Sequence, residues 1–193
     1  MLIIGDVHGK LNDYQNIIEK HSSDKSIQIG DFGFKKEHDW HIENIDPEKH
    51  KILFGNHDYY PYLNKPHSLG NFAYLEEDNI FCIRGAYSID QALRLQGHSW
   101  FDNEELTYSE FQTVLDYFES VSPDIVITHD CPDSIRKKFF GIYDKSITST
   151  GLQACLEIHQ PKLWIFGHHH QSIKQTVENT EFVCLAELEK FFL

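Results

Sequence analysis

The sequence predicts an α/β fold that combines parallel and antiparallel β-strands. Short apolar runs, each the length of a buried strand, alternate along the chain with segments of helical periodicity. Two further runs near the end of the sequence flank a short polar turn, which predicts an antiparallel hairpin. The 193 residues contain no internal repeat and no low-complexity linker, so we expect one domain over residues 1–193.

Five of the apolar runs end abruptly in clusters of Gly, Thr, Asp, Asn or His. Each run is rich in Ile, Leu, Val or Phe and is predicted to be a buried strand. These runs are Met1–Ile4, Ser26–Ile29, Lys51–Phe54, Asp124–Ile127 and Lys162–Phe166. Further strands are predicted at Asn79–Ile83 and, in the hairpin, at Ser172–Val177 and Glu181–Leu185.

Three helices are predicted between the strands, because apolar residues recur there at the spacing of one helix face. The second follows a capping box of Thr107 and Glu110, and the third ends before Pro161. A helical or loop insert that shapes the site is expected at about residues 59–121. The apolar faces are Leu11, Tyr14, Ile17 and Ile18; Phe111, Val114, Leu115 and Phe118; and Leu152, Cys155 and Leu156.

Composition restricts the classes of partner. The formal net charge is −13, which argues against a nucleic-acid-binding surface, although bound divalent cations can still attract a phosphate. No segment reads as a signal peptide or a membrane-spanning helix, so we expect a cytoplasmic protein, or one of the host cytoplasm if a phage encodes it. The four cysteines are widely spaced, which predicts reduced thiols.

The five strand ends carry the residues that bear chemistry. They are Gly5–Gly9, Gly30–Gly33, Gly55–Asp58, Thr128–Asp130 and Gly167–His170. Because ligands bind at the carboxyl ends of strands in open α/β sheets, these ends are expected to deliver carboxylates, imidazoles and a carboxamide to one place. Alternate residues of an extended chain point the same way, so both side chains of a D-x-H or H-x-H pair can reach one ion. Such a set suits a pair of divalent cations that activates a hydroxide against a phosphoryl group.

In this order the motifs resemble the calcineurin-like metallophosphoesterase superfamily: D-x-H, G-D-x-x, G-N-H-[D/E], a lone His, and G-H-x-H. The resemblance runs from Asp6 to His170 and is closest to the small single-domain members of bacteria and phages, an impression that Ile83–Asp90 strengthens. It implies mixed sheets packed as a sandwich and flanked by helices, an αββα arrangement.

The resemblance also implies roles for individual residues. One divalent ion would be bound by Asp6, His8 and His170, and the second by Asn56, His129 and His168. Asp31 would bridge the two ions. His57 would bind no metal but face the substrate, as general acid or transition-state stabiliser, and Asp58 would orient its imidazole. Manganese is favoured, with iron, zinc, nickel and cobalt as alternatives.

The second motif departs from that of the protein Ser/Thr phosphatases. There, the motif continues to an arginine that grips the phosphate. Here the sequence continues to Lys35 and Lys36, so that arginine is missing. Lys35, Lys36 and Arg84 are candidates to replace it.

These features predict an enzyme that hydrolyses phosphoesters by attack of a metal-bridging hydroxide, with phosphomonoesters of a protein or small molecule preferred. A phosphodiesterase acting on cyclic nucleotides, other small diesters or nucleic acid is the alternative. A non-catalytic binding scaffold is disfavoured, because every ligand position is filled. The sequence predicts neither the substrate nor the oligomeric state.

Several nearby residues are interpreted as structural. Cys131 is predicted to be a small loop residue, and Arg136–Lys138 a solvated charged turn. His169, the middle residue of its motif, is expected to point away from its neighbours. Tyr59, Tyr60 and Tyr62 are candidates to line the pocket.

Overall fold

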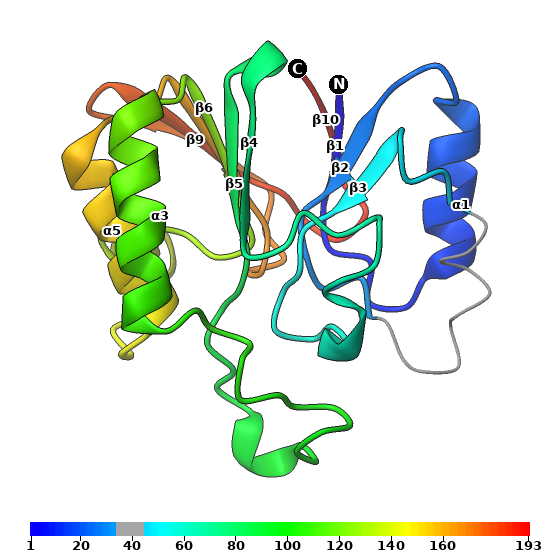
Figure 1. Cartoon of the computed structure of the whole chain (residues 1–193), viewed down its shortest axis with the longest axis horizontal. Helices are drawn as coiled ribbons and strands as arrows, with labels where there is room; N and C mark the ends of the chain where they lie inside the picture. Colours follow the sequence, from blue (N-terminus) through cyan, green and yellow to red (C-terminus); the bar gives the residue numbers. More distant parts are fainter. Residues whose placement is uncertain (34–44) are drawn as a thin grey trace.

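Two facing β-sheets with helices on their outer sides form the four layers of this protein (Figure 1). The structure is a computed structural model and describes residues 1–33 and 45–193. α1 (Leu11–Lys20) covers the first sheet, and α3 (Tyr108–Val121) and α5 (Ile147–Ile158) cover the second. The predicted α/β sandwich flanked by helices is confirmed.

The first sheet has four strands in the order β10–β1–β2–β3. Its three consecutive parallel strands begin the chain, and β10 pairs antiparallel with β1. The strands are β1 (Leu2–Ile4), β2 (Ser26–Gln28), β3 (His50–Ile52) and β10 (Lys190–Phe192).

The second sheet has six strands in the order β4–β5–β6–β7–β9–β8. The central four are parallel, and an antiparallel strand lies at each edge. The strands are β4 (Phe72–Leu75), β5 (Ile80–Ile83), β6 (Ile125–Thr128), β7 (Leu163–Phe166), β8 (Ile173–Val177) and β9 (Thr180–Cys184). The hairpin predicted near the end of the sequence is formed by β8 and β9.

Alternation of apolar side chains on each strand builds the layers. In β1, Leu2 and Ile4 face α1, whereas Ile3 faces the second sheet. Because both faces of these strands are covered, the runs are continuously apolar. Between the sheets, Ile27 and Leu53 pack with residues such as Ile127 and Ile165.

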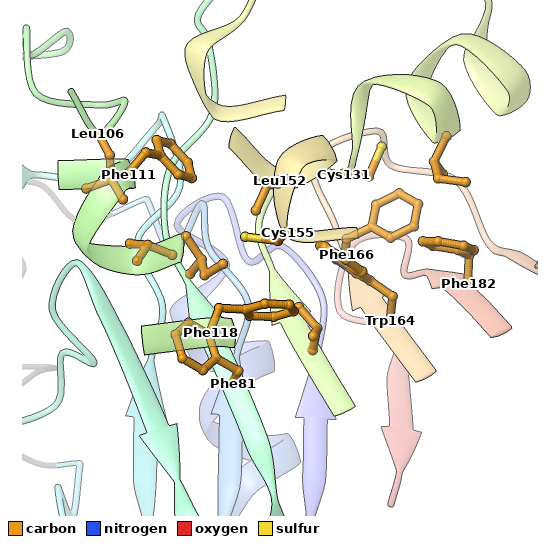
Figure 2. Close-up of a cluster of buried hydrophobic side chains, with 14 of the residues drawn as sticks. Phe81, Leu106, Phe111, Phe118, Cys131, Leu152, Cys155, Trp164, Phe166 and Phe182 are labelled. Atoms are coloured by element: carbon orange, nitrogen blue, oxygen red, sulfur yellow. The ribbon is translucent and has the colours of Figure 1, made fainter. Parts of the chain in front are cut away.

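The outer side of the second sheet carries the largest aromatic core. Phe118 of α3 packs edge-on against Phe81 of β5, with ring centroids 5.2 Å apart (Figure 2). Leu152 and Cys155 of α5 lie in the same cluster as Trp164. The capping box predicted at Thr107 and Glu110 begins α3. All four cysteines are buried and free.

Among the α-helices and strands of the described residues, three were not predicted. They are β4, β10 and α4 (Asp133–Phe140). The helix α4 replaces the charged turn that the sequence suggested at Arg136–Lys138, and Arg136 is buried in it rather than solvated. Short strands at a sheet edge or in a pairing distant in sequence have little local signal of their own.

Residues 59–121, the expected helical or loop insert, contain β4, β5 and α3, which belong to the second sheet and its outer layer. Between β5 and α3, the long loop of residues 84–107 has one short 3₁₀ turn, η4 (Gln91–Leu93), and projects from the end of the sandwich (Figure 1). The other 3₁₀ turns in the described parts of the chain are η2 (Tyr60–Tyr62) and η3 (Glu76–Asp78). Within the described ranges, no helix combines the length and apolar character needed to span a membrane.

The aromatic layer in Figure 2 generates a stability prediction. Phe118→Ala should lower the free energy of unfolding by about 3–5 kcal/mol, because it removes a fully buried ring and leaves a cavity. The neighbouring exposed Glu119→Ala is the control and should change it by no more than about 0.5 kcal/mol. Urea denaturation measures both. A cost below about 1 kcal/mol for Phe118→Ala would show that this layer is not close-packed.

Candidate metal centre

The predicted ligands come from strand ends of both sheets. Asp6 and His8 follow β1, Asp31 follows β2, and Asn56 follows β3, all in the first sheet. The remaining ligands follow β6 and β7 of the second sheet: His129, His168 and His170. The sandwich therefore brings together residues far apart in sequence, such as His8 and His170, which are 162 positions apart.

The first cluster consists of Asp6, His8, Asp31 and His170, whose donor atoms lie within 4.8 Å of one another. The Nε2 atoms of His8 and His170 face each other at 2.8 Å. Asp6 Oδ2 lies 3.2 Å from His170 Nε2 and 3.7 Å from His8 Nε2. Ligand atoms about 2.1 Å from one octahedral ion are roughly 3 Å apart, so this spacing suits a shared cation.

The second cluster consists of Asp31, His129 and His168, again within 4.8 Å. Asn56 belongs to it, because its Oδ1 atom lies 3.2 Å from His129 Nε2. His129 Nδ1 bonds the carbonyl of Ile29, which leaves Nε2 facing the cluster. Burial lowers the pKa of His168 to about 4, so its imidazole is neutral at pH 7, the form that binds a metal.

Asp31 belongs to both clusters. Its Oδ2 atom lies 3.7 Å from His8 Nε2, and its Oδ1 atom lies 3.2 Å from His129 Nε2. Burial alone would raise its pKa, but the charge and hydrogen bond of His129 hold the pKa of Asp31 well below its usual range. Burial also opposes protonation of His129, yet Asp31 raises the pKa of that imidazole to about 10.

Four of these candidate ligands adopt a left-handed backbone. Their φ angles are 47° for His8, 52° for Asp31, 64° for His168 and 53° for His170. Residues other than glycine rarely take this conformation, which costs about 1–3 kcal/mol at each position. The turns that follow the strands are therefore strained at the residues that carry the ligands.

Glycines beside the ligands allow the backbone to approach closely. A Cβ atom added at Gly55 would overlap Asp31 Oδ1 and would lie 2.5 Å from His129 Nε2. A Cβ atom at Gly167 would overlap Asp6 Oδ1. The donor set and this close packing of backbone fit a compact binuclear metal centre.

His57 differs from its neighbours because its side chain is exposed. Its backbone N–H donates to Asp31 Oδ1 at 2.7 Å, and its ring lies edge-on to His8, with centroids 5.8 Å apart. Burial of part of the ring lowers the pKa of His57, and this effect exceeds the opposing charge of Asp31.

Asp58 points into the protein. Its carboxylate accepts the N–H of Gly55 at 2.8 Å and the N–H of Gly33 at 3.0 Å. No hydrogen bond joins it to the His57 imidazole in the part of the chain that the structure describes. Burial, followed by the charge of Asp31, raises the pKa of Asp58 to about 7. Its contacts hold the turns after β2 and β3 together, and its predicted role toward His57 stays a prediction.

A network from the long loop orients Asn56. The side-chain Nδ2 of Asn56 donates to Ser88 Oγ at 3.0 Å, which turns Oδ1 toward His129. Ser88 donates to Glu104 Oε2 at 2.5 Å. Arg94 Nη2 donates to the Asn56 carbonyl at 2.7 Å and to Glu104 Oε1 at 2.8 Å. The sequence motifs did not identify Arg94 or Glu104, although Ser88 lies in the segment Ile83–Asp90 noted above.

A second network supports the turn after β7. His169 Nε2 lies 3.2 Å from Asp130 Oδ1 and 3.7 Å from Cys131 Sγ, and its ring stacks on Phe140, with centroids 3.8 Å apart. The other carboxylate oxygen of Asp130 accepts from Ser149 Oγ at 2.8 Å. His169 thus points away from the ligands, as predicted, and fixes the chain between them.

A pocket of about 320 Å³ opens beside both clusters. Its apolar wall is formed by Tyr87, Ile89 and Ile142, and its charged lining residues outside the clusters are Asp90 and Arg136. This volume is within the range of small-molecule sites, about 300–1,000 Å³. The candidates Tyr59, Tyr60, Tyr62 and Arg84 are not among its described lining residues, and Lys35 and Lys36 lie outside the described residues.

Solved structures with a similar fold include three at 10–15% identity, a level that shows the fold alone. A candidate 5′-nucleotidase from Staphylococcus aureus, in complex with α-ketoglutarate, has a TM-score of 0.56 and 15% identity over 96% of this chain and 48% of its own. The sulfate thiohydrolase SoxB of Thermus thermophilus has 0.52 and 10%, over 95% and 38%. The protein TT1561 of Thermus thermophilus has 0.51 and 10%, over 97% and 89%.

This chain thus spans about half the length of the nucleotidase and less of the thiohydrolase. No curated protein matches the sequence. The sequence model of the calcineurin-like phosphoesterases, by contrast, matches residues 1–172, a range that contains every candidate ligand. The chain belongs to the calcineurin-like phosphoesterase family.

Proposed function

We propose that this protein is a binuclear metal-dependent phosphoesterase that hydrolyses phosphate monoesters. The observation that carries the proposal is the placement of Asp31, whose two carboxylate oxygens face separate clusters of histidine and oxygen ligands. A carboxylate in this position is suited to bridge two cations. The rest of each cluster completes a mixed nitrogen and oxygen set that suits manganese, iron, zinc, nickel or cobalt, with manganese favoured.

The chain would hold one ion with Asp6, His8 and His170 and the other with Asn56, His129 and His168. When bound, the ions supply Lewis acidity and a hydroxide nucleophile at neutral pH. The protein contributes a fixed ligand geometry, because the network of Arg94, Ser88 and Glu104 aims the Asn56 oxygen. His57, whose exposed ring lines the pocket, is placed to donate a proton to a leaving oxygen.

The preference for monoesters is proposed from charge. A monoester dianion brings more negative charge to the pocket than a diester, and Arg136 contributes a permanent positive charge to the pocket's described lining. Asp90 opposes this effect, and its charge is offset only in part by Arg94, which lies 3.4 Å away but also pairs with Glu104 at 2.8 Å. A diesterase acting on cyclic nucleotides or other small diesters is the alternative, and a non-catalytic scaffold is disfavoured because no ligand is missing.

The most direct test is hydrolysis by metal-reconstituted protein. We expect p-nitrophenyl phosphate and a phosphopeptide to be hydrolysed faster than bis-p-nitrophenyl phosphate and a 2′,3′-cyclic nucleotide. Activity should stop when a chelator is added and return with manganese. Hydrolysis of none of these four substrates by fully metallated protein would favour the scaffold, and faster cleavage of a diester would favour the diesterase.

Metal content tests the bridging role of Asp31. Wild-type protein should bind two manganese ions per chain after reconstitution and dialysis, measured by elemental analysis. Asp31→Asn should weaken both sites together, because the amide loses the charge while keeping the shape and tolerating the left-handed backbone. Asp13→Asn, an exposed change on α1, is the matched control and should retain two ions. A single ion at saturation in the wild type would contradict the binuclear centre.

His57→Ala separates proton donation from metal binding. The variant should keep two ions and lose about 10²–10⁴-fold in rate on an alkyl phosphate, whose alkoxide leaving group needs a proton. The loss should be smaller for p-nitrophenyl phosphate, whose leaving group does not. Elemental analysis measures the bound ions, and steady-state kinetics with both substrates measures the two losses in rate. Loss of an ion would make His57 a ligand, and equal losses in rate would mean that it stabilises phosphoryl charge without protonating the leaving oxygen.

A further inference from the structure

The arginines of this chain are few enough to compare one by one. The sequence contains three, Arg84, Arg94 and Arg136, and all three are almost completely buried. A buried guanidinium is costly unless its N–H groups find acceptors. Two of the three are extensively engaged by the protein itself.

Arg84 is a structural residue of the sandwich. Its Nε donates to Asn71 Oδ1 at 2.9 Å, and its Nη1 donates to the Asn103 carbonyl at 2.8 Å. The guanidinium also lies over the Tyr60 ring, 5.0 Å from the centroid. It is absent from the described lining of the pocket beside the metal clusters, so the sequence-based suggestion that it holds phosphate has no support in its position.

Arg94 also makes several hydrogen bonds within the protein. Its nitrogens donate to the carbonyls of Ser99 and Asn56, to Ser88 Oγ and to the carboxylate of Glu104. These bonds hold the long loop on the turn that carries Asn56. Binding an anion through this guanidinium would require breaking the network that orients a candidate ligand.

Arg136 differs from Arg84 and Arg94 in having fewer hydrogen bonds within the protein and in lining the pocket. It is 3% exposed, yet its Nε has no hydrogen-bond partner among the described residues. One Nη2 bond reaches the carbonyl of Asp144, and the carboxylate oxygen Oδ1 of Asp133 is 3.9 Å away. Arg136 also lines the pocket together with Asn56 and His57. A buried cation with an unused donor therefore borders the space beside the ligands.

The position of α4 makes this placement rigid. The helix begins at Asp133, four residues after the candidate ligand His129, so Arg136 lies on its first turn. Ile135 of the same turn is buried in the core of the second sheet. Lys137, the next residue, is exposed and pairs with Asp133 on the outside of the helix. Of the described segment Arg136–Lys138, it is Arg136 that lines the pocket.

We propose that Arg136 binds a phosphate oxygen of the substrate, and so takes the role of the arginine missing from the second motif. This inference rests on the proposed function, which places the phosphate in the pocket. A planar guanidinium offers paired N–H donors that match phosphate oxygens, and Arg136 lines the pocket in which the phosphate would lie. The hydrogen bonds of this guanidinium within the described residues leave its Nε without a partner, so a bound phosphate would add an acceptor to an incompletely paired buried cation.

The test compares variants of the metal-loaded protein with inorganic phosphate as the probe. Arg136→Gln should weaken phosphate binding at least about tenfold in calorimetry, the loss expected for one charge-assisted hydrogen bond, with two ions still bound. It should raise KM for p-nitrophenyl phosphate by a similar factor. Arg136→Lys, which keeps the charge without the fork, should lie between this variant and the wild type. Lys137→Gln is the matched control on the exposed side of the helix and should bind phosphate as the wild type does.

A second measurement uses the wild-type chain and needs no catalysis. With zinc-loaded protein labelled with ¹⁵N-arginine, NMR should give one Nε–H signal for each of the three arginines. We expect phosphate to shift the Arg136 signal, identified by its absence from Arg136→Lys, and to leave the signals of Arg84 and Arg94 in place.

These readouts separate the inference from the proposed function. A phosphate-induced shift at Arg136 in a protein that hydrolyses no phosphoester would support the inference and contradict the proposed function. Active wild-type protein with an unmoved Arg136 signal would overturn the inference alone. So would an Arg136→Gln variant that keeps two ions and binds phosphate as the wild type does. If that variant unfolds, the signal of the wild type still decides.

Discussion

The carboxylate of Asp31 lies where the two sheets meet, and the arrangement of the whole site depends on it. It is 1% exposed, so its charge must be balanced by protein groups or by cations. One oxygen faces His129, which the second sheet supplies, and the other faces His8, which the first sheet supplies. Because Asp31 contacts histidines from both sheets, the carboxyl ends of the strands of both sheets must lie at the same place.

The sandwich satisfies that requirement through its core. Residues such as Ile3 and Ile165 pack between the sheets and fix the distance from one set of strand ends to the other. Gly55 then lets the turn after β3 pass directly beside Asp31 and His129. Farther out, the loop that contains Arg94 and Glu104 fixes the amide of Asn56. The core, the close approach at Gly55 and the loop each restrict the positions of the candidate ligand atoms. Such restriction preorganises a site for metal binding.

Much of this could be predicted from the sequence. The strands that carry motifs are continuous apolar runs, and the abrupt change to Gly, Asp and His marks where each one ends. The division of these strands between two sheets could not be read from such runs, because pairing partners are set by tertiary packing. β10 illustrates the difficulty, since Phe191 pairs with Ile3 from the other end of the described chain.

The sequence also did not predict the burial and contacts of several polar residues near the site. Arg136 stands in a run of charges that resembles a solvated surface, and only the direction of α4 reveals that it is buried. Asp58 is next to His57 in sequence, but its carboxylate turns to the N–H groups of Gly33 and Gly55. Adjacent positions at a strand end face opposite ways, so sequence proximity did not translate into contact.

The left-handed backbone at His8, Asp31, His168 and His170 has a consequence for selection. Glycine would adopt the same turns without strain, so a chain relieved of its metals would gain stability by replacing these residues. In a protein without metal binding, mutations would therefore tend to replace these four residues early. Their presence together in one sequence is what selection for the proposed metal-binding function would maintain.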